Sequence, residues 1–176
     1  MRATMIDPAR ALRPAAPADL PAIVGLIREL AVYEKLEHLV VATADSIAPH
    51  LFGPRRAAEV VVAEIEVEDR IDIVGFALFF TNFSTFLGRP GLYLEDLYVQ
   101  PAHRGLGLGK ALLAHLGALA VERGCGRFEW SVLDWNASAI GFYERMGATL
   151  LPDWRICRVT GEALAAFGRA RAPANG

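Results

Sequence analysis

The stretch Arg104-Gly105-Leu106-Gly107-Leu108-Gly109-Lys110 decides how this chain folds, because a strand-like run precedes it and a helix-like run follows it. The run before it is GLYLEDLYV (91–99), and the run after it is KALLAHLGALAVER (110–123). A glycine-rich turn between a strand and a helix leaves backbone N–H groups unpaired at the positive end of the helix dipole. Such groups bind phosphate oxygens readily, so the sequence predicts a phosphorylated ligand.

Two well-known phosphate-binding patterns do not fit this turn. A P-loop needs glycine where Arg104 stands and a magnesium-binding hydroxyl where Ala111 stands. The dinucleotide-binding fingerprint that Gly105 and Gly107 begin lacks its third glycine, which would fall on Lys110. A purely structural turn that packs a helix on a sheet is the alternative at this point.

The composition excludes several classes of protein. The chain has 176 residues, 53% of them hydrophobic, which is enough for the core of one domain. Its net charge of −2 argues against nucleic acid and anionic membranes as partners. Cys125 and Cys157 are too few for a disulfide framework, no Cys/His cluster has zinc-ligand spacing, and neither a signal peptide nor a membrane span is recognisable. We therefore expect a cytoplasmic protein that binds no metal.

The spacing of hydrophobic residues predicts alternating strands and helices. We expect a strand at 11–13, a helix from Asp19 to 33 or 35, a helix from Thr43 to 52, strands at 58–65 and 73–80 around a turn at 66–72, and a strand ending at 99. After the glycine turn we expect a helix to 123, a strand at 127–133, a helix at 137–146 capped by Asn136, a strand at 155–160 and a helix at 161–171. This order predicts one α/β domain at 11–171, with a mixed, mostly antiparallel sheet flanked by helices, after a flexible leader at 1–10.

Four motifs in the expected order resemble the GNAT superfamily of N-acetyltransferases. The glycine turn matches the pattern Arg-x-x-Gly-x-Gly of that family's acetyl-CoA pyrophosphate loop, at Arg104, Gly107 and Gly109. The segments YLEDLYV (93–99), DWNASAIGFYERMGA (134–148), and LRP (12–14) with ELAVYE (29–34) are similar to the diamine branch, which includes the spermidine/spermine and thialysine N-acetyltransferases. The resemblance covers about residues 11–167 and implies the GNAT fold, whose sheet splays at the acetyl-CoA site.

The resemblance also implies which residues hold acetyl-CoA. The pantetheine arm would bond to the strand edge at Leu97, Tyr98 and Val99, and Asn136 and Ala139 would flank it from the other side, with Tyr143 at the thioester. Gly107 and Gly109 lack side chains, so the backbone can approach the pyrophosphate closely. The residues implied for the pyrophosphate are Arg104, Gly105, Leu106, Gly107, Leu108, Gly109 and Lys110.

Acetyl transfer from a thioester needs a neutral amine, but an alkylammonium has a pKa of about 10.4, so fewer than about one molecule in a thousand is neutral at pH 7. In the diamine branch, the glutamate that matches Glu95 is proposed to take the proton through water; a regular strand would point Asp96 to the opposite face. Tyr143 matches the tyrosine that protonates the leaving thiolate in many relatives, which a phenol of pKa about 10 can do. The alternatives are a solvated or ion-paired Glu95 and a tyrosine at 143 that only packs.

Substrate choice is expected to depend on acidic and aromatic residues. A polyamine or diamino acid carries a second cation, and the branch holds it near the end of the first helix, where Tyr33 and Glu34 stand. Glu129 is expected to add a carboxylate, and Phe86, where relatives often carry tryptophan, an aromatic wall. The alternative is one solvated helix face that comprises Glu29, Glu34 and Glu37.

The sequence therefore predicts an enzyme that transfers acetyl from acetyl-CoA to a primary amine of a small cationic molecule, by direct attack in a ternary complex. The substrate would be a diamine, a polyamine or a lysine-like amino acid such as thialysine. A homodimer is the family expectation. Two alternatives stay open. One is a GNAT enzyme that acts on a peptide or protein amine in an open groove. The other is a non-catalytic acyl-CoA-binding regulatory domain, against which the presence of both Glu95 and Tyr143 counts.

Overall fold

The computed structural model describes residues 7–169 apart from 9 and 69, and it divides the chain into two compact units, Met1–Leu133 and Asp134–Gly176. Most of the leader expected at 1–10, and residues 170–171 of the expected last helix, lie outside the described residues. The two units are described one after the other below.

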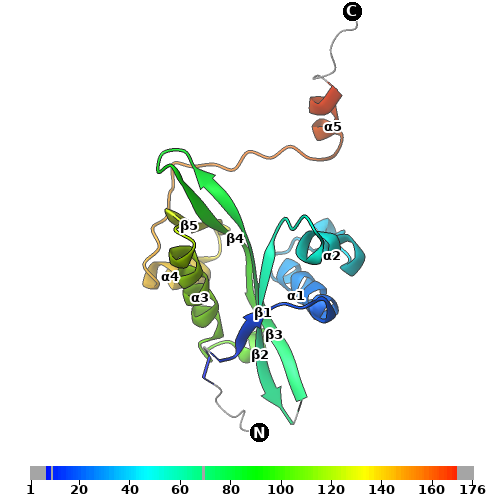
Figure 1. The fold of residues 1–176 in the computed structure, drawn as a ribbon, viewed down its shortest axis with the longest axis vertical. Coiled ribbons are helices and arrows are strands. Elements are labelled where there is room, and N and C mark those ends of the chain that lie inside the picture. Colours follow the sequence, from blue (N-terminus) through cyan, green and yellow to red (C-terminus); the bar gives the residue numbers. More distant parts are fainter. Residues whose placement is uncertain (1–6, 9, 69, 170–176) are drawn as a thin grey trace, which may run out of the picture. The chain divides into compact units, whose positions relative to one another are not determined.

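The first unit is built on one open sheet, whose strands lie side by side in the order β1-β2-β3-β4-β5 (Figure 1). The strands are β1 (Leu12–Pro14), β2 (Glu59–Val67), β3 (Arg70–Ser84), β4 (Arg89–Val99) and β5 (Arg127–Trp130). All neighbouring pairs are antiparallel except β4 and β5, which are parallel. This sheet confirms the predicted mixed, mostly antiparallel α/β class.

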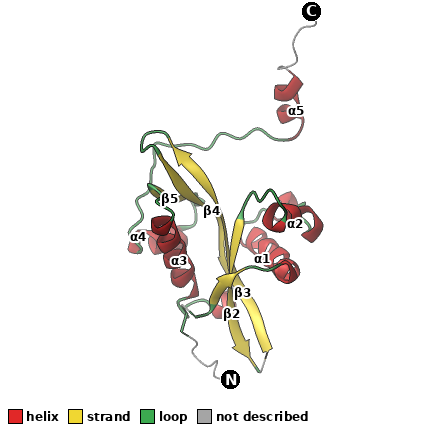
Figure 2. Ribbon diagram, in the orientation of Figure 1, coloured by secondary structure: helices red, strands yellow, loops and turns green. Residues whose placement is uncertain are grey.

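Helices cover both faces of this sheet (Figure 2). On one face lie α1 (Leu20–Tyr33) and α2 (Ala44–Phe52), and on the other lies α3 (Leu108–Glu122). The core on the α1 face comprises Leu20, Ile23, Leu26, Leu51, Val60, Val62, Phe76 and Tyr98. Short 3-10 turns at Pro17–Asp19, Glu37–Leu39 and Pro101–His103 connect these elements. Because neighbouring strand residues point to opposite faces, one strand serves both cores.

The predicted helix caps differ in outcome. Thr43 caps α2 as predicted, because its hydroxyl accepts a hydrogen bond from the Ser46 backbone N–H at 3.2 Å. Asp19 precedes α1 but does not cap it with its side chain. Its carboxylate accepts a hydrogen bond from the Ala16 backbone N–H at 2.7 Å and pairs with Arg13 at 2.6 Å, which ties the entry of α1 to β1.

Three expected strands have different bounds. β2 and β3 run through most of the turn predicted at 66–72, because Glu66 pairs with Ile71 and Val67 with Arg70. β5 ends at Trp130 rather than at 133. The strand predicted at 155–160 is wrong: these residues are exposed and form neither strand nor helix.

The second unit contains α4 (Ala137–Arg145) and α5 (Gly161–Arg169). Asn136 caps α4 as predicted, since its side-chain oxygen accepts a hydrogen bond from the Ala139 backbone N–H at 3.2 Å. Between the two helices the chain is irregular. Large exposed apolar side chains in this unit include Leu151, Trp154, Ile156, Leu164 and Phe167.

Candidate active site

β4 changes its surroundings halfway along its length. β5 pairs with it only from Gly91, opposite Arg127, to Leu94, opposite Trp130. From Glu95 to Val99 the strand continues with β3 on one side, and no described strand lies on the other. We call residues 95–99 the open half of β4. On the open side it leaves the backbone groups of Leu97 and the N–H of Val99, two residues of the predicted pantetheine edge, without a partner strand, whereas the Val99 oxygen accepts a hydrogen bond from the Arg104 side chain at 3.0 Å.

A bulge in β4 marks the start of the open half. The register with β3 shifts here, so that Leu94 lies opposite Phe79 and Asp96 lies opposite Leu78, while Glu95 is the extra residue. Cross-strand partners share a face, and Phe79 faces α3 because Arg123 of that helix lies over its ring. Leu78 instead packs against the core on the α1 face. The bulge therefore turns Asp96 to the α1 face, whereas a regular strand would have kept it on the side of Leu94.

Three carboxylates gather at this point, and we call Glu34, Glu95 and Asp96 the acidic cluster. Burial, together with the negative charges of Glu95 and Glu34, raises the pKa of Asp96 from its ordinary value of 3.8 to about 6. Burial also raises the pKa of Glu34, whereas Glu95 is exposed. None of the ion pairs formed among the described residues involves this cluster. The site thus concentrates negative charge that a cation would stabilise.

Asp96 is the residue that the sequence analysis missed as a candidate. Among the described acids, Asp96 has a strongly raised pKa, and it directly follows Glu95, the predicted proton acceptor. The bulge that exposes it to Glu34 depends on pairing with β3, far away in the sequence. The only available signal was the adjacency of two acids, Glu95 and Asp96, in an otherwise apolar strand.

The glycine turn leads from the open half of β4 into α3. Gly105 and Gly107 have φ angles of 80° and 83°, and α3 begins immediately after Gly107. A Cβ built on Gly105 or Gly109 would meet no atom within 4 Å, so the turn borders open space. The first N–H groups of α3 have no acceptor within the helix. The turn therefore has the backbone conformation and the room that an anionic group needs.

The other residues predicted to bind acetyl-CoA differ in how exposed their side chains are. Tyr98 and Leu108 have buried side chains, and Tyr98 is also paired with Phe76 of β3. Leu106 and Lys110 are exposed. The Arg104 guanidinium is turned back toward α1 and β4, where it lies against the rings of Tyr33 and Tyr98.

The predicted substrate residues differ in their surroundings. Tyr33 is the last residue of α1 and Glu34 caps it, and the charge of Glu34 acts on Asp96. Their role in binding the substrate stays a prediction. The Glu129 carboxylate already accepts a hydrogen bond from Asn82 at 2.8 Å and pairs with Arg127 at 3.1 Å. The side chain of Phe86, in the turn between β3 and β4, is 95% exposed.

Glu29 does not belong to a solvated helix face, which was the alternative for the acids of α1. Its carboxylate accepts hydrogen bonds from the Tyr98 hydroxyl at 3.2 Å and from the Gln100 side-chain amide at 2.9 Å. Glu29 therefore anchors α1 to the end of β4. Glu34, just past the end of α1, is the acid of this segment that belongs to the acidic cluster.

The predicted residues of the second unit lie on or next to α4. Asn136 and Ala139 form its N-terminal cap, as described above. Tyr143 is half-buried in the last turn, and its ring centroid lies 5.3 Å from that of Phe142. The catalytic role of Tyr143 stays a prediction.

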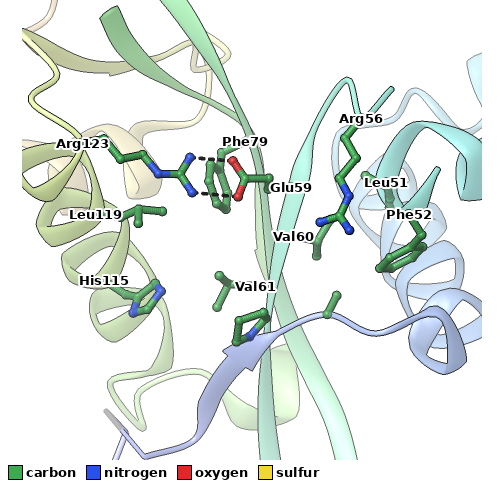
Figure 3. A pocket seen from close by; sticks show the side chains of 12 residues that line it. Leu51, Phe52, Arg56, Glu59, Val60, Val61, Phe79, His115, Leu119 and Arg123 are labelled. Atoms are coloured by element: carbon green, nitrogen blue, oxygen red, sulfur yellow. Dashed lines mark hydrogen bonds and ion pairs between the residues drawn. The ribbon is translucent and has the colours of Figure 1, made fainter. Parts of the chain in front are cut away.

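A separate cavity of about 290 Å³ lies beside the start of β2, between α2 and α3 (Figure 3). Arg123 spans it and donates hydrogen bonds to both oxygens of Glu59, at 2.6 and 2.8 Å. This contact lowers the pKa of Glu59, so its charge is already neutralised. No residue of the acidic cluster or the glycine turn lines this cavity, and we do not place the reaction here.

Among the described residues, no three histidine, cysteine, aspartate or glutamate side chains lie together in a way that would hold a metal ion. None of the described helices has the length and the apolar character that crossing a bilayer requires.

Comparison with known proteins identifies the family of this chain. The model of the acetyltransferase (GNAT) family matches residues 26–148. The L-ornithine N5-acetyltransferase of Arabidopsis thaliana is 36% identical, over 90% of this chain and 87% of its own. The thialysine N-epsilon-acetyltransferase of Mus musculus is also 36% identical, over 87% of this chain and 94% of its own.

Solved structures show the same fold. An integron cassette protein from the mobile metagenome of V. cholerae superimposes with a TM-score of 0.72 at 25% identity, over 90% of this chain and 96% of its own. The family match covers most of the chain, and two relatives named as N-acetyltransferases align over nearly all of it. The chain therefore belongs to the acetyltransferase (GNAT) family and is an acyltransferase.

Proposed function

We propose that this enzyme transfers the acetyl group of acetyl-CoA to a primary amine of a small cationic substrate: a diamine, a polyamine or a lysine-like amino acid such as thialysine. The observation that carries the proposal is the acidic cluster: the charges of Glu95 and Glu34 both act on the buried Asp96 at the start of the open half, and none of the three acids is in the ion pairs found among the described residues. Thialysine and ornithine, after which similar chains are named, each carry two amino groups.

Acetyl-CoA would lie along the open half of β4. The backbone of Leu97 and Val99 would bond to its pantetheine arm, as a neighbouring strand does elsewhere in the sheet. The pyrophosphate would sit on the N–H groups that follow Gly107, where the positive end of the α3 dipole favours anions. The exposed Lys110 would add positive charge.

The amine must lose a proton before its nitrogen can attack the thioester carbonyl carbon. Glu95 is exposed in the bulge and would take this proton through a water molecule. Asp96 and Glu34 would hold the second cation of the substrate, because a positive charge beside them offsets both the burial and the neighbouring negative charges that raise the pKa of Asp96. Negative charge thus serves both binding and proton removal.

Collapse of the tetrahedral intermediate forms the amide and breaks the carbon–sulfur bond. The departing thiolate needs a proton, and the Tyr143 hydroxyl would donate it. Asn136 and Ala139, at the start of the same helix, would flank the pantetheine arm. Direct attack needs both substrates bound together, so the reaction passes through a ternary complex.

Two further properties belong to this proposal. We place the enzyme in the cytoplasm, where Cys125 and Cys157, both free, would stay reduced. We also propose a homodimer, because the exposed apolar side chains of the second unit, among them Trp154, Ile156 and Phe167, would be covered by a second copy.

The experiment measures thiol release from acetyl-CoA with a panel of amines: thialysine, lysine, ornithine, spermidine, putrescine, a peptide and an aminoglycoside. We expect turnover with one cationic class of small amine. Tyr143→Phe keeps the ring and removes the acid, so we expect kcat to fall about a hundredfold or more, while the KM for the amine changes little.

Three results would contradict the proposal. Tight acetyl-CoA binding without turnover of any amine would indicate a regulatory acyl-CoA-binding domain. Turnover of the peptide alone would indicate a protein acetyltransferase. Full activity of Tyr143→Phe would remove this tyrosine from the chemistry.

A further inference from the structure

Arg104 begins the glycine turn, but its side chain does not follow the turn toward α3. Its Nε donates a hydrogen bond to the backbone oxygen of Val99 at 3.0 Å. Its guanidinium carbon lies 5.0 Å from the ring centroid of Tyr33 and 5.6 Å from that of Tyr98. Both distances are within the range in which a cation is attracted to an aromatic face.

The two rings place the guanidinium on the α1 face of the sheet. Tyr98 belongs to the buried core that α1 and α2 form with the sheet, and Tyr33 is the last residue of α1. The N–H groups that would bind the pyrophosphate begin α3, which covers the opposite face. The Arg104 guanidinium therefore contacts two tyrosine rings on the face of the sheet to which Asp96 of the acidic cluster also points.

Arg104 and Glu29 together fix the end of α1. Glu29 is bonded to Tyr98 and Gln100 of the β4 end, as described above. Arg104 adds a contact one turn later, at Tyr33, whose direct neighbour is Glu34 of the acidic cluster. Removing the guanidinium would therefore remove a contact that the Tyr33 ring makes with the end of β4 and the glycine turn.

We infer that Arg104 is a positioning residue for the amine site: it holds Tyr33, and through Tyr33 the end of α1 that carries Glu34, while the pyrophosphate is held by backbone N–H groups and Lys110. The inference rests on the proposed function, because it presumes an amine at the acidic cluster. Arg104, the first residue of the glycine turn, would thus act at the amine site rather than at the acetyl-CoA phosphates.

Arg104→Lys separates the two roles. Lysine keeps the positive charge that a phosphate contact would need, but it lacks the planar group and the Nε–H that meet the tyrosines and Val99. We expect the KM for the amine to rise about tenfold, while the Kd of acetyl-CoA without amine, measured by calorimetry, stays within about twofold. An acetyl-CoA Kd weakened about tenfold with an unchanged amine KM would overturn the inference, as would no change in either quantity.

A double-mutant cycle tests whether Arg104 acts through Tyr33. In a Tyr33→Leu background, which lacks the ring, we expect Arg104→Lys to change the amine KM by less than about twofold. A full tenfold effect in that background would contradict action through Tyr33. Arg123→Lys is the matched control, because Arg123 also combines a stacked ring, Phe79, with hydrogen bonds, to Glu59, but at the opposite end of α3. We expect it to leave both constants unchanged.

Failure of the proposed function would be distinguishable. If the wild type bound acetyl-CoA but acetylated no amine, the proposed function would fail. The comparison of acetyl-CoA Kd values between wild type and Arg104→Lys would still decide whether this arginine holds the phosphates. A weakened Kd would then overturn the inference, and an unchanged Kd would support the assignment of the phosphates to the backbone.

Discussion

The two halves of β4 belong to one strand but do different things. From Gly91 to Leu94 the strand is paired on both sides, and Leu92 and Leu94 are buried in the core. From Glu95 to Val99 it is paired on one side only, and it carries two acids at its start. The paired half builds the sheet, and the open half supplies the groups that a ligand can use. A single bulge separates the two.

The comparison indicates where function can be placed without loss of stability. In the paired half, a residue that lost its strand pairing would break hydrogen bonds and expose buried apolar surface, which would lower the stability of the fold. The open half has a partner strand on one side only, so backbone groups on its other side are available for binding. Asp96, whose pKa is raised, can bind a cation without loss of an existing ion pair to another described residue. The following predictions test this division.

Glu95→Gln in the open half should give the largest effect. The amide has the size of the carboxylate but cannot accept a proton, so we expect kcat to fall about a hundredfold to ten-thousandfold with the preferred amine. Stability should change by less than about 0.5 kcal/mol, because Glu95 is exposed and forms no ion pair among the described residues. Steady-state kinetics and urea unfolding measure the two. An unchanged kcat would remove Glu95 as the proton acceptor.

Leu92→Ala in the paired half should do the opposite. Leu92 is completely buried, and we expect the free energy of unfolding to fall by about 2 to 5 kcal/mol as a cavity forms. The KM for the amine should stay within about twofold at a temperature where the variant is folded. Urea unfolding followed by circular dichroism gives the stability. A small loss of stability with a large rise in KM would contradict the division of the strand.

Asp96→Asn, near the boundary between the two halves of β4, should change both stability and activity. The folded protein keeps an acid whose pKa is about 6 instead of 3.8, so removing its charge should stabilise the fold at pH 7.5 by as much as about 3 kcal/mol. The same substitution should lower kcat/KM for the amine about a hundredfold, because a carboxylate facing the substrate cation is lost. Asp72→Asn, in an exposed ion pair with Arg70, is the control for a general charge effect. A variant that is both less stable and fully active would refute this assignment.

The pH dependence should report the same group. Asp96 must be ionised to attract a cation, so kcat/KM for the amine should decline about tenfold per pH unit below about pH 6. The free energy of unfolding should depend on pH in the opposite direction: protonation of Asp96 removes a buried charge, so this residue destabilises the fold less as the pH falls. Between about pH 6 and 3.8 the folded chain takes up a proton at Asp96 that the unfolded chain does not, so the stability gap between wild type and Asp96→Asn should narrow as the pH falls. A gap that widens on acidification would exclude a raised pKa.

The elements with local signals could be predicted from the sequence. Thr43 and Asn136 cap α2 and α4 because the capping bond closes within three residues. The glycine turn was recognisable because the strand pattern before it and the helix pattern after it are both contiguous. These features depend on neighbours in the sequence, which is why their prediction was accurate.

The features that depend on distant partners could not be predicted. The bulge at Glu95 is set by the register against β3, and it decides which face Asp96 occupies. The partners of Glu129, which are Asn82 and Arg127, meet it only when β3 and β5 are brought together. The apolar residues at 155–160 suggested a strand, but apolar content does not supply a neighbouring strand.

The most direct test of the division of β4 is hydrogen–deuterium exchange of the wild-type protein with and without acetyl-CoA. We predict that acetyl-CoA slows exchange of the amides in the open half, at residues 97–99, and in the glycine turn at 105–110. The paired half at 91–94 should not change, because its amides are already bonded within the sheet. Slower exchange at 59–61, along the cavity edge of β2, without an effect at 97–110 would contradict the account and place acetyl-CoA elsewhere.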